Sequence, residues 1–448
     1  MARIIAYYVS TEMALLGLFE LILSFALIDL MLASQGPSTL MPSVMLASGG
    51  SLNLAAMLTI TIGVAAATIG LYRPEALIDR NSLLISALVA GVVAFPVGLV
   101  IIDGAGFGIS LQDVFWLLTV LGAWLVCIFL TRLAVRGVLG RTRLARRVLV
   151  VGEGERAQRP FDTLDGGRFR RFEPVQAGVD PDRLSLEMLR EHRIWAVILA
   201  QPVGLEAVLA PLLDNRHNGI RVVDDAGFHE RHLGRIDLDT IGSHWLTDTR
   251  ASRPSAMAKR AFDVVVSLLL LLLTAPLMAA TALLIKLESR GPVFYRQQRA
   301  GLHGAPFTVL KFRSMSVDAE AGGKPRWAQK QDPRITRMGR FIRPMRIDEL
   351  PQLLNVLSGE MSMIGPRPER PHFVEQLAEV IPFYGERSCV KPGLTGWAQV
   401  NFPYGASVED AREKLAYDLY YVKNRSMLLD LLILLSTVRV VLFREGAR

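Results

Sequence analysis

Two adjacent carboxylates, Asp348 and Glu349, occur in the proline-punctuated stretch RIDELPQLLNVLSGEMSMIGPRPE. Adjacent acids are common on helix surfaces, but these two lie among arginines. Opposite charge lowers the pKa of a carboxylate and keeps it ionised at neutral pH. One ionised acid can then attack phosphorus and form an aspartyl-phosphate-type intermediate, while the other can hold Mg²⁺ against the same phosphates. The pair therefore predicts phosphoryl-transfer chemistry.

Basic residues precede and follow the acid pair in several short motifs. The segments RQQRAG, FTVLKFRSM and GPRPERP supply the side chains that we expect to bind substrate phosphates: Arg296, Arg299, Lys311, Arg313 and Arg367. Arginine forks match phosphate oxygens, and the two prolines beside Arg367 restrict the backbone beneath its fork. A basic face for anionic lipid headgroups would explain the charge. It would not explain the glycines, the prolines and the acid pair.

The N-terminal third contains four apolar runs, near residues 13–33, 52–72, 83–102 and 114–135. Each approaches the roughly 20 residues that a membrane-spanning helix needs. Lys and Arg are absent after the first and third runs but follow the second and fourth, which places both ends of the bundle in the cytoplasm. The chain is 51% hydrophobic with a formal net charge of +8. Beside such runs, this charge indicates cytoplasmic flanks and anionic ligands rather than nucleic acid.

A soluble α/β pattern follows, from about residue 146 to residue 250. RVLVVGEGERA, WAVILA and IRVVDD read as buried parallel strands. Gly152, Gly154 and Ala157 form a G-x-G-x-x-A turn that could seat a phosphate at a helix N-terminus. The expected ribose-binding acid is missing, so we interpret the segment as a Rossmann-like domain with a structural turn. A nucleotide site remains the alternative.

A fifth apolar run, KRAFDVVVSLLLLLLTAPLMAATALLIKLESRGPVF, is long enough to cross a membrane. Basic residues flank both of its ends, and Pro276 near its middle removes a backbone donor and kinks the helix. These features predict a re-entrant hairpin that keeps the rest of the chain cytoplasmic. The last apolar helix, SMLLDLLILLSTVRVVLF, suits either the membrane interface or a protein core.

Residues 259–448 resemble the catalytic module of the bacterial polyprenyl-phosphate hexose-1-phosphate transferases, in the monotopic phosphoglycosyl transferase superfamily. The resemblance rests on KRAFD, GPVFYRQQRAG, KFRSM, RIDELPQLLNVLSGEMSMIGPRPERP, PGLTGWAQV and YGASVEDAREKLAYDLYYVKN. The parts before it resemble those of the long members that initiate exopolysaccharide or O-antigen synthesis. The last motif is similar to that of the exosortase-associated exopolysaccharide branch.

The resemblance implies transfer of a hexose 1-phosphate from a UDP-sugar to undecaprenyl phosphate, with release of UMP. It implies that Asp348 is the nucleophile, that Glu349 binds Mg²⁺, and that Pro276 breaks the re-entrant helix. Lys311, Arg313 and Arg367 would lie at the phosphates or close behind the acid pair. It also implies a homodimer in the bacterial inner membrane, with the catalytic domain on the cytoplasmic face.

The sequence thus predicts three parts: a four-helix transmembrane bundle (1–140), a Rossmann-like α/β domain (141–252) and a mostly helical catalytic domain with a re-entrant membrane helix (253–448). One alternative is a membrane-anchored nucleotide sensor whose last part binds lipid without turnover. Another is direct transfer, with the acid pair acting as a base. The sequence does not identify the hexose, although the resemblance favours glucose and galactose.

Overall fold

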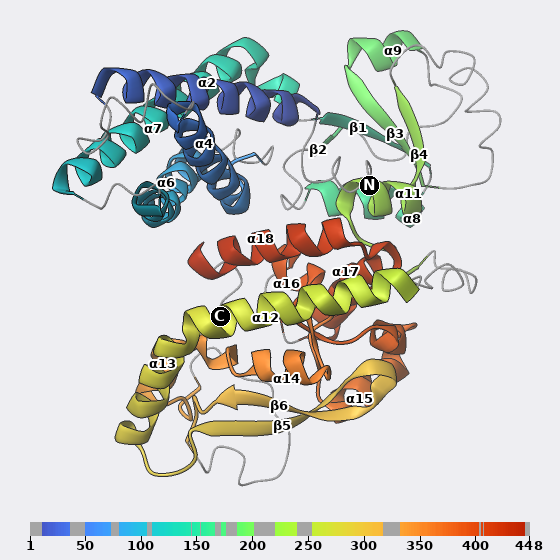
Figure 1. Ribbon diagram of the computed structural model, residues 1–448. Coiled ribbons are helices and arrows are strands. Elements are labelled where there is room, and N and C mark those ends of the chain that lie inside the picture. The colour runs from blue at the N-terminus through green and yellow to red at the C-terminus, as the bar shows by residue number, and fades with distance from the viewer. Residues whose placement is uncertain are drawn as a thin grey trace. The chain divides into compact units, whose positions relative to one another are not determined.

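The computed structural model describes residues 11–35, 50–72, 80–104, 110–144, 146–152, 154–165, 172–175, 186–200, 220–239, 253–316, 332–402, 405 and 407–443. The chain forms two compact units, Met1–Leu233 and Gly234–Arg448 (Figure 1). The second unit begins before the boundary predicted at residue 252. Within it, Ile236 N donates to Ala416 O at 2.9 Å and Trp397 Nε1 donates to Gly234 O at 2.6 Å.

The four N-terminal apolar runs form four helices: α2 (Thr11–Gln35), α4 (Gly50–Ile69), α6 (Arg80–Ile102) and α7 (Leu111–Leu144). In α2, α4 and α7 an apolar stretch is long enough to cross a membrane, whereas the described apolar stretch of α6, Ser86–Ile102, is shorter. Large aliphatic side chains such as Leu30, Val92 and Leu130 are exposed on these helices. Exposed aliphatic faces on helices of this length are typical of lipid contact.

One buried ion pair connects these helices. Arg132 of α7 donates from Nε and Nη2 to the two carboxylate oxygens of Glu20 in α2, at 2.8 and 3.0 Å. Its Nη1 donates to Leu71 O, just after α4, at 2.6 Å. Both charged side chains are about 1% exposed. Because each charge is paired and hydrogen-bonded, this contact can hold three helices together within an apolar environment.

The α/β segment contains a four-stranded parallel sheet in the order β2-β1-β3-β4. Its strands are β1 (Arg146–Val151), β2 (Phe172–Pro174), β3 (Ile194–Leu199) and β4 (Arg221–Asp224). The other elements are α8 (Gly154–Asp165), α9 (Leu186–Glu191), α11 (Asp225–Phe228) and a π-helical turn, His229–Leu233. Alternate residues of β1 enter two separate hydrophobic clusters, so both faces of the sheet are covered. The three predicted strands are confirmed.

The glycine turn after β1 has a backbone explanation. Gly152 has φ of +144°, and a Cβ there would lie 3.1 Å from Ala200 Cβ, at the end of β3. Gly154 has φ of +65° where α8 begins. Residues that carry a side chain rarely adopt these backbone conformations. The turn therefore requires glycine whether or not it binds a phosphate.

The second unit begins its regular structure with the fifth apolar run, which forms α12 (Arg253–Glu288). Pro276 lies inside this helix, and the ribbon is continuous but bends along its length (Figure 1). Most of its large aliphatic side chains are exposed, including Leu269, Leu272 and Leu273. By length and composition α12 could also cross a membrane.

Further regular elements follow α12. They include β5 (Phe294–Ala300), β6 (Pro306–Phe312), α13 (Arg337–Ile342), α14 (Gln352–Ser358), β7 (Ser362–Ile364), α15 (Pro371–Val380), the 3-10 turn η8 (Tyr384–Cys389), β8 (Gly393–Thr395), α16 (Trp397–Asn401), α17 (Val408–Asn424) and α18 (Met427–Phe443). β5 and β6 form an antiparallel hairpin, and β7 pairs with β8 in parallel.

The KRAFD motif attaches α12 to the rest of this unit. Lys259 Nζ contacts Asp430 of α18 at 2.9 Å, and Asp263 accepts from Met363 N of β7 at 3.1 Å. Arg260 donates to the last carbonyls of α14, both at 2.6 Å. Asp430 is itself buried. One side of α18 therefore packs in the protein core, which was one of its two predicted settings.

Candidate active site

The acid pair lies on a short 3-10 turn, η7 (Ile347–Glu349). Arg346, just before it, has a left-handed backbone with φ of +57°, which is uncommon for a residue other than glycine. Ile347 packs against Ile285 and Phe312 in the hydrophobic core. This anchored turn leaves Asp348 and Glu349 9% and 6% exposed.

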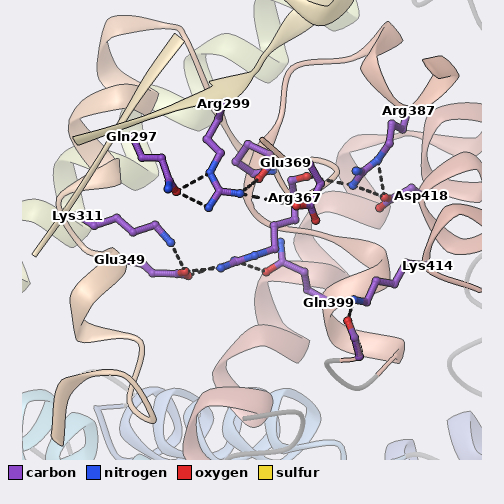
Figure 2. A network of polar contacts seen from close by, with 12 residues as sticks. Gln297, Arg299, Lys311, Glu349, Arg367, Glu369, Arg387, Gln399, Lys414 and Asp418 are labelled. Atoms are coloured by element: carbon purple, nitrogen blue, oxygen red, sulfur yellow. Dashed lines mark hydrogen bonds and ion pairs between the residues drawn. The ribbon is translucent and has the colours of Figure 1, made fainter. Parts of the chain in front are cut away.

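Glu349 is surrounded by cations. Its Oε1 accepts from Lys311 Nζ at 2.9 Å and from Arg367 Nη2 at 2.6 Å, and Arg346 Nη1 lies 3.7 Å away. Figure 2 shows the Lys311 and Arg367 side chains converging on this carboxylate. Burial raises the pKa of Glu349, but the three cations outweigh it and hold that pKa well below its usual range. Glu349 is therefore an anion that organises the basic side chains.

Asp348 has a different environment. Its Oδ1 is buried and has no hydrogen-bond partner among the described residues. Burial and the negative charge of Glu349 raise the pKa of Asp348 to about 6, although Lys311, Arg343 and Arg346 oppose the shift. The nearby arginines lower this pKa as expected, but burial has the larger effect, so the net shift is upward. At pH 7 about nine tenths of this carboxyl group is still ionised.

This raised pKa predicts a pH dependence. If turnover requires ionised Asp348, kcat/KM should fall as the pH drops through about 6, and approach a tenfold loss per pH unit below it. If Asp348 had an ordinary aspartate pKa, kcat/KM would not change until the pH fell to about 4. Initial rates between pH 4.5 and 8, with folding checked at each pH, would measure this limb. A flat profile down to pH 4.5 would contradict the assignment.

The β5–β6 hairpin brings Lys311 and Arg299 to the same side. Its register pairs Tyr295 with Lys311 and Arg299 with Phe307, and alternate residues of a strand share a face. Arg299 Nη2 donates to Gln297 Oε1 at 2.6 Å, and its Nη1 donates to Pro368 O at 3.1 Å (Figure 2). Arg299 thus lies against the Pro-Arg-Pro segment.

Arg296 lies on the opposite face of the same strand, because strand side chains alternate in direction. Its side chain is exposed. The predicted pair of phosphate ligands from RQQRAG is therefore divided by the pleat of β5. Arg299 faces the acid pair's side of the hairpin, and Arg296 does not.

Arg313 is also placed away from the acid pair. Its buried guanidinium donates to Arg290 O at 3.0 Å, to Ser289 O at 2.9 Å and to Ser289 Oγ at 2.8 Å. These acceptors follow the last turn of α12, where helix carbonyls lack intrahelical partners. Arg313 therefore fixes the end of the apolar helix, and we do not retain it among the proposed phosphate ligands.

Three groups near Arg367 were missing from the predicted site. Gln399 Oε1 accepts from Arg367 Nη1 at 3.4 Å, and its Nε2 is buried without a partner among the described residues. Arg387 donates to Arg367 O at 3.0 Å and to Asp418 Oδ2 at 2.8 Å. Asp418 follows Arg387 by 31 positions. Only the folded chain reveals such a pairing.

The acid pair offers oxygen ligands that a magnesium ion could use. Asp348 Oδ1 has no partner, and Glu349 Oε2 accepts one long hydrogen bond, at 3.4 Å from Arg367 Nη1, within the described part of the chain. Mg²⁺ prefers carboxylate oxygens and completes its coordination with water and substrate phosphates. Glu349 Oε2, which has only this long contact among the described residues, fits such an ion.

Comparisons with known proteins place this unit among related sequences. The sequence model described as "Bacterial sugar transferase" matches residues 254–444. The chain is 47% identical over 219 residues to a UDP-N-acetylgalactosamine-undecaprenyl-phosphate N-acetylgalactosaminephosphotransferase of Aeromonas hydrophila, covering 49% of this chain and 52% of that protein. It is 37% identical over 327 residues to an undecaprenyl-phosphate glucose phosphotransferase of Komagataeibacter xylinus, covering 68% and 60%.

A third relative is matched over more of its own length. This is a UDP-glucose:undecaprenyl-phosphate glucose-1-phosphate transferase of Caulobacter vibrioides, 47% identical over 193 residues, which cover 43% of this chain and 72% of that protein. By contrast, the chain spans only about half to three fifths of the first two relatives. The segment that matches the family model, residues 254–444, contains the acid pair, Lys311 and Arg367.

Proposed function

The chain belongs to the bacterial sugar transferase family, and we propose that it transfers a sugar 1-phosphate from a UDP-sugar to undecaprenyl phosphate, releasing UMP. This would be the first membrane step of exopolysaccharide or O-antigen synthesis. The observation that carries the proposal is the buried Oδ1 of Asp348, which has no hydrogen-bond partner among the described residues, beside the cation-bound Glu349. A nucleotide sensor without turnover would not need this arrangement.

In the proposed reaction, Asp348 is the nucleophile. Its carboxylate oxygen attacks the phosphorus that carries the sugar and forms a new O–P bond. The bond from that phosphorus to the bridging oxygen breaks, and UMP leaves with the electron pair. A phosphate oxygen of undecaprenyl phosphate then attacks the same phosphorus and displaces Asp348.

The cations around Glu349 would stabilise the phosphate charge in both steps. Lys311 and Arg367 already converge on one carboxylate, so their positive charges are held together before substrate arrives. Arg299 would extend this basic surface along the hairpin. When bound, Mg²⁺ would neutralise phosphate oxygens. Glu349 would hold it, and Asp348 would stay available as the nucleophile.

The proposed test is a purified enzyme assay. Full-length protein with Mg²⁺ and undecaprenyl phosphate would be offered UDP-glucose, UDP-galactose, UDP-N-acetylglucosamine and UDP-N-acetylgalactosamine, with UMP release measured. We expect one sugar to be preferred, since relatives are named for both glucose and N-acetylgalactosamine. Absence of UMP with every donor would contradict the proposal.

We propose that α12 is a re-entrant membrane helix in a chain that also contains a transmembrane bundle and a Rossmann-like domain, as the resemblance implies. The protein would then lie in the inner membrane as a homodimer with its catalytic unit on the cytoplasmic face. The exposed aliphatic side chains of α12, its internal Pro276 and its basic ends support this arrangement.

This arrangement predicts that the catalytic unit is protected from membrane-impermeant reagents in intact cells. Cys389 is a poor reporter, because burial and Glu386 raise the pKa of its thiol to about 11. Val380, which is 59% exposed at the end of α15, offers a better position. A Val380→Cys variant should be labelled by an impermeant maleimide only after cells are lysed. Labelling in intact cells would show that α12 crosses the membrane.

A further inference from the structure

The Pro-Arg-Pro segment is held through its carbonyl oxygens. Four consecutive carbonyls each accept a hydrogen bond from a different donor: Pro366 O from Gly393 N at 2.9 Å, Arg367 O from Arg387 Nη2 at 3.0 Å, Pro368 O from Arg299 Nη1 at 3.1 Å and Glu369 O from Ala300 N at 2.8 Å. The two prolines have no N–H to donate. The position of this backbone therefore depends on its carbonyl partners.

The packing beside the segment leaves a small space on the side of Arg387. A cavity of about 20 Å³, roughly the room of one water molecule, lies between the segment and the turn η8. Its lining includes Arg367, Arg387 and Val390. Beside this space, the hydrogen bond from Arg387 to Arg367 O is a direct contact that holds the segment.

Arg387 is itself fixed in one orientation. Its side chain is 9% exposed, and it donates from Nε and Nη2 to Asp418 Oδ2 at 3.1 and 2.8 Å and from Nη1 to Tyr384 OH at 3.0 Å. Asp418 belongs to α17, whose Ser407 capping box and buried face fix the helix in the unit. Figure 2 shows Arg387 and Asp418 on the far side of Arg367 from Glu349.

We infer that Arg387, oriented by Asp418, is a positioning residue that sets the Arg367 guanidinium against Glu349 by holding the carbonyl oxygen of Arg367. This inference rests on the proposed function, because it assigns a role within that same site. The hydrogen bonds of Arg387 within the described part of the chain go to Asp418, Tyr384 and Arg367 O and not to either acid, so its effect on chemistry passes through Arg367.

A double-mutant cycle tests this inference, with UMP release as the readout. The four proteins are wild type, Arg387→Met, Arg367→Met and the double variant. We expect Arg387→Met to lower kcat/KM by about 10- to 100-fold in the wild-type background and by less than about threefold in the Arg367→Met background. Residues that act through one another give such non-additive effects.

The matched control is Arg235→Met. Arg235 also forms a two-point ion pair with a carboxylate of α17, Glu413, at 2.7 and 2.9 Å. Its side-chain hydrogen bonds among the described residues go to Glu413 and not to the Pro-Arg-Pro segment. Its effect on kcat/KM should therefore be small and equal in both backgrounds. If Arg387→Met does not fold, Asp418→Asn replaces it in the cycle, because it frees the guanidinium while keeping side-chain volume.

The pH profile gives a second readout that a loss of folded protein would not change. When the Arg367 guanidinium moves away, the negative charge of Glu349 is less neutralised and raises the pKa of Asp348 further. The fall of kcat/KM at acid pH should therefore begin at a higher pH in Arg387→Met. The inference is overturned if Arg387→Met lowers kcat/KM by the same factor in both backgrounds, or if the pH at which kcat/KM falls does not change. Turnover by the wild type would still support the proposed function in that case. If the wild type releases no UMP, both fall.

Discussion

Asp348→Asn is expected to lower UMP release by about four orders of magnitude or more, the scale seen when a covalent nucleophile is removed. The amide keeps the shape of the side chain but has no anionic oxygen to attack phosphorus. Asp348 Oδ1 has no partner among the described residues, so the substitution breaks no hydrogen bond there. A large loss with unchanged thermal stability would therefore report chemistry rather than folding.

The covalent intermediate gives this prediction a second measurement. Wild-type enzyme with UDP-sugar but no lipid should release up to one equivalent of UMP, and intact-protein mass spectrometry should detect the sugar phosphate on Asp348. Undecaprenyl phosphate should remove it. If UMP forms only when lipid is present and no adduct is found, direct transfer replaces the covalent mechanism.

A matched control separates this effect from a general loss of charge. Asp239 pairs with Arg412 at the surface of the same unit and is 51% exposed. Asp239→Asn should retain near-normal turnover, since exposed ion pairs contribute little. Near-normal turnover of Asp348→Asn would instead show that the assignment of the acid pair is wrong.

Local pattern was enough to predict the long apolar helices and three strands of the α/β segment. Apolar runs of about 20 residues gave the helices α2, α4, α6, α7 and α12, and β-branched runs gave β1, β3 and β4. These signals depend on neighbours in the sequence. The bend and membrane setting of α12 depend on the bilayer as well, so they remain proposals.

Site residues were predictable where a sequence motif groups them. They were not predictable where strand register or burial determines the position of a side chain. Lys311 and Arg367 meet at Glu349, as expected of cations grouped by motif. Arg296 was expected beside them, but the pleat of β5 directs it away. Arg313 caps α12, because β6 ends next to that helix terminus. No sequence pattern reports such tertiary contacts.

The opposite pKa shifts of the two acids also required the structure. Adjacent residues in the same basic segment have similar neighbours in sequence. Glu349 receives Lys311 and Arg367 directly, whereas Asp348 is buried without a direct partner among the described residues. Burial therefore has the larger effect on the pKa of Asp348, and the cations have the larger effect on the pKa of Glu349. This difference assigns separate tasks to the two acids.

Glu349→Gln is expected to lower kcat/KM by about 100- to 1,000-fold, because one substitution removes the shared partner of Lys311, Arg367 and Arg346. The cations would lose their common anchor and repel one another within a buried site. If Glu349 also holds Mg²⁺, half-maximal activity should need a higher metal concentration. A magnesium titration of both proteins measures this shift.

The same variant should move the pH profile in a direction opposite to that of Arg387→Met. The charge of Glu349 raises the pKa of Asp348, so its removal, with the cations left unneutralised, should lower that pKa and shift the acid limb below about 6. Glu413→Gln, which breaks the pair with Arg235, should leave both the limb and the magnesium dependence unchanged. If Glu349→Gln loses activity with the acid limb and the magnesium requirement both unmoved, Glu349 supports the fold alone, and Asp348 must be activated without it.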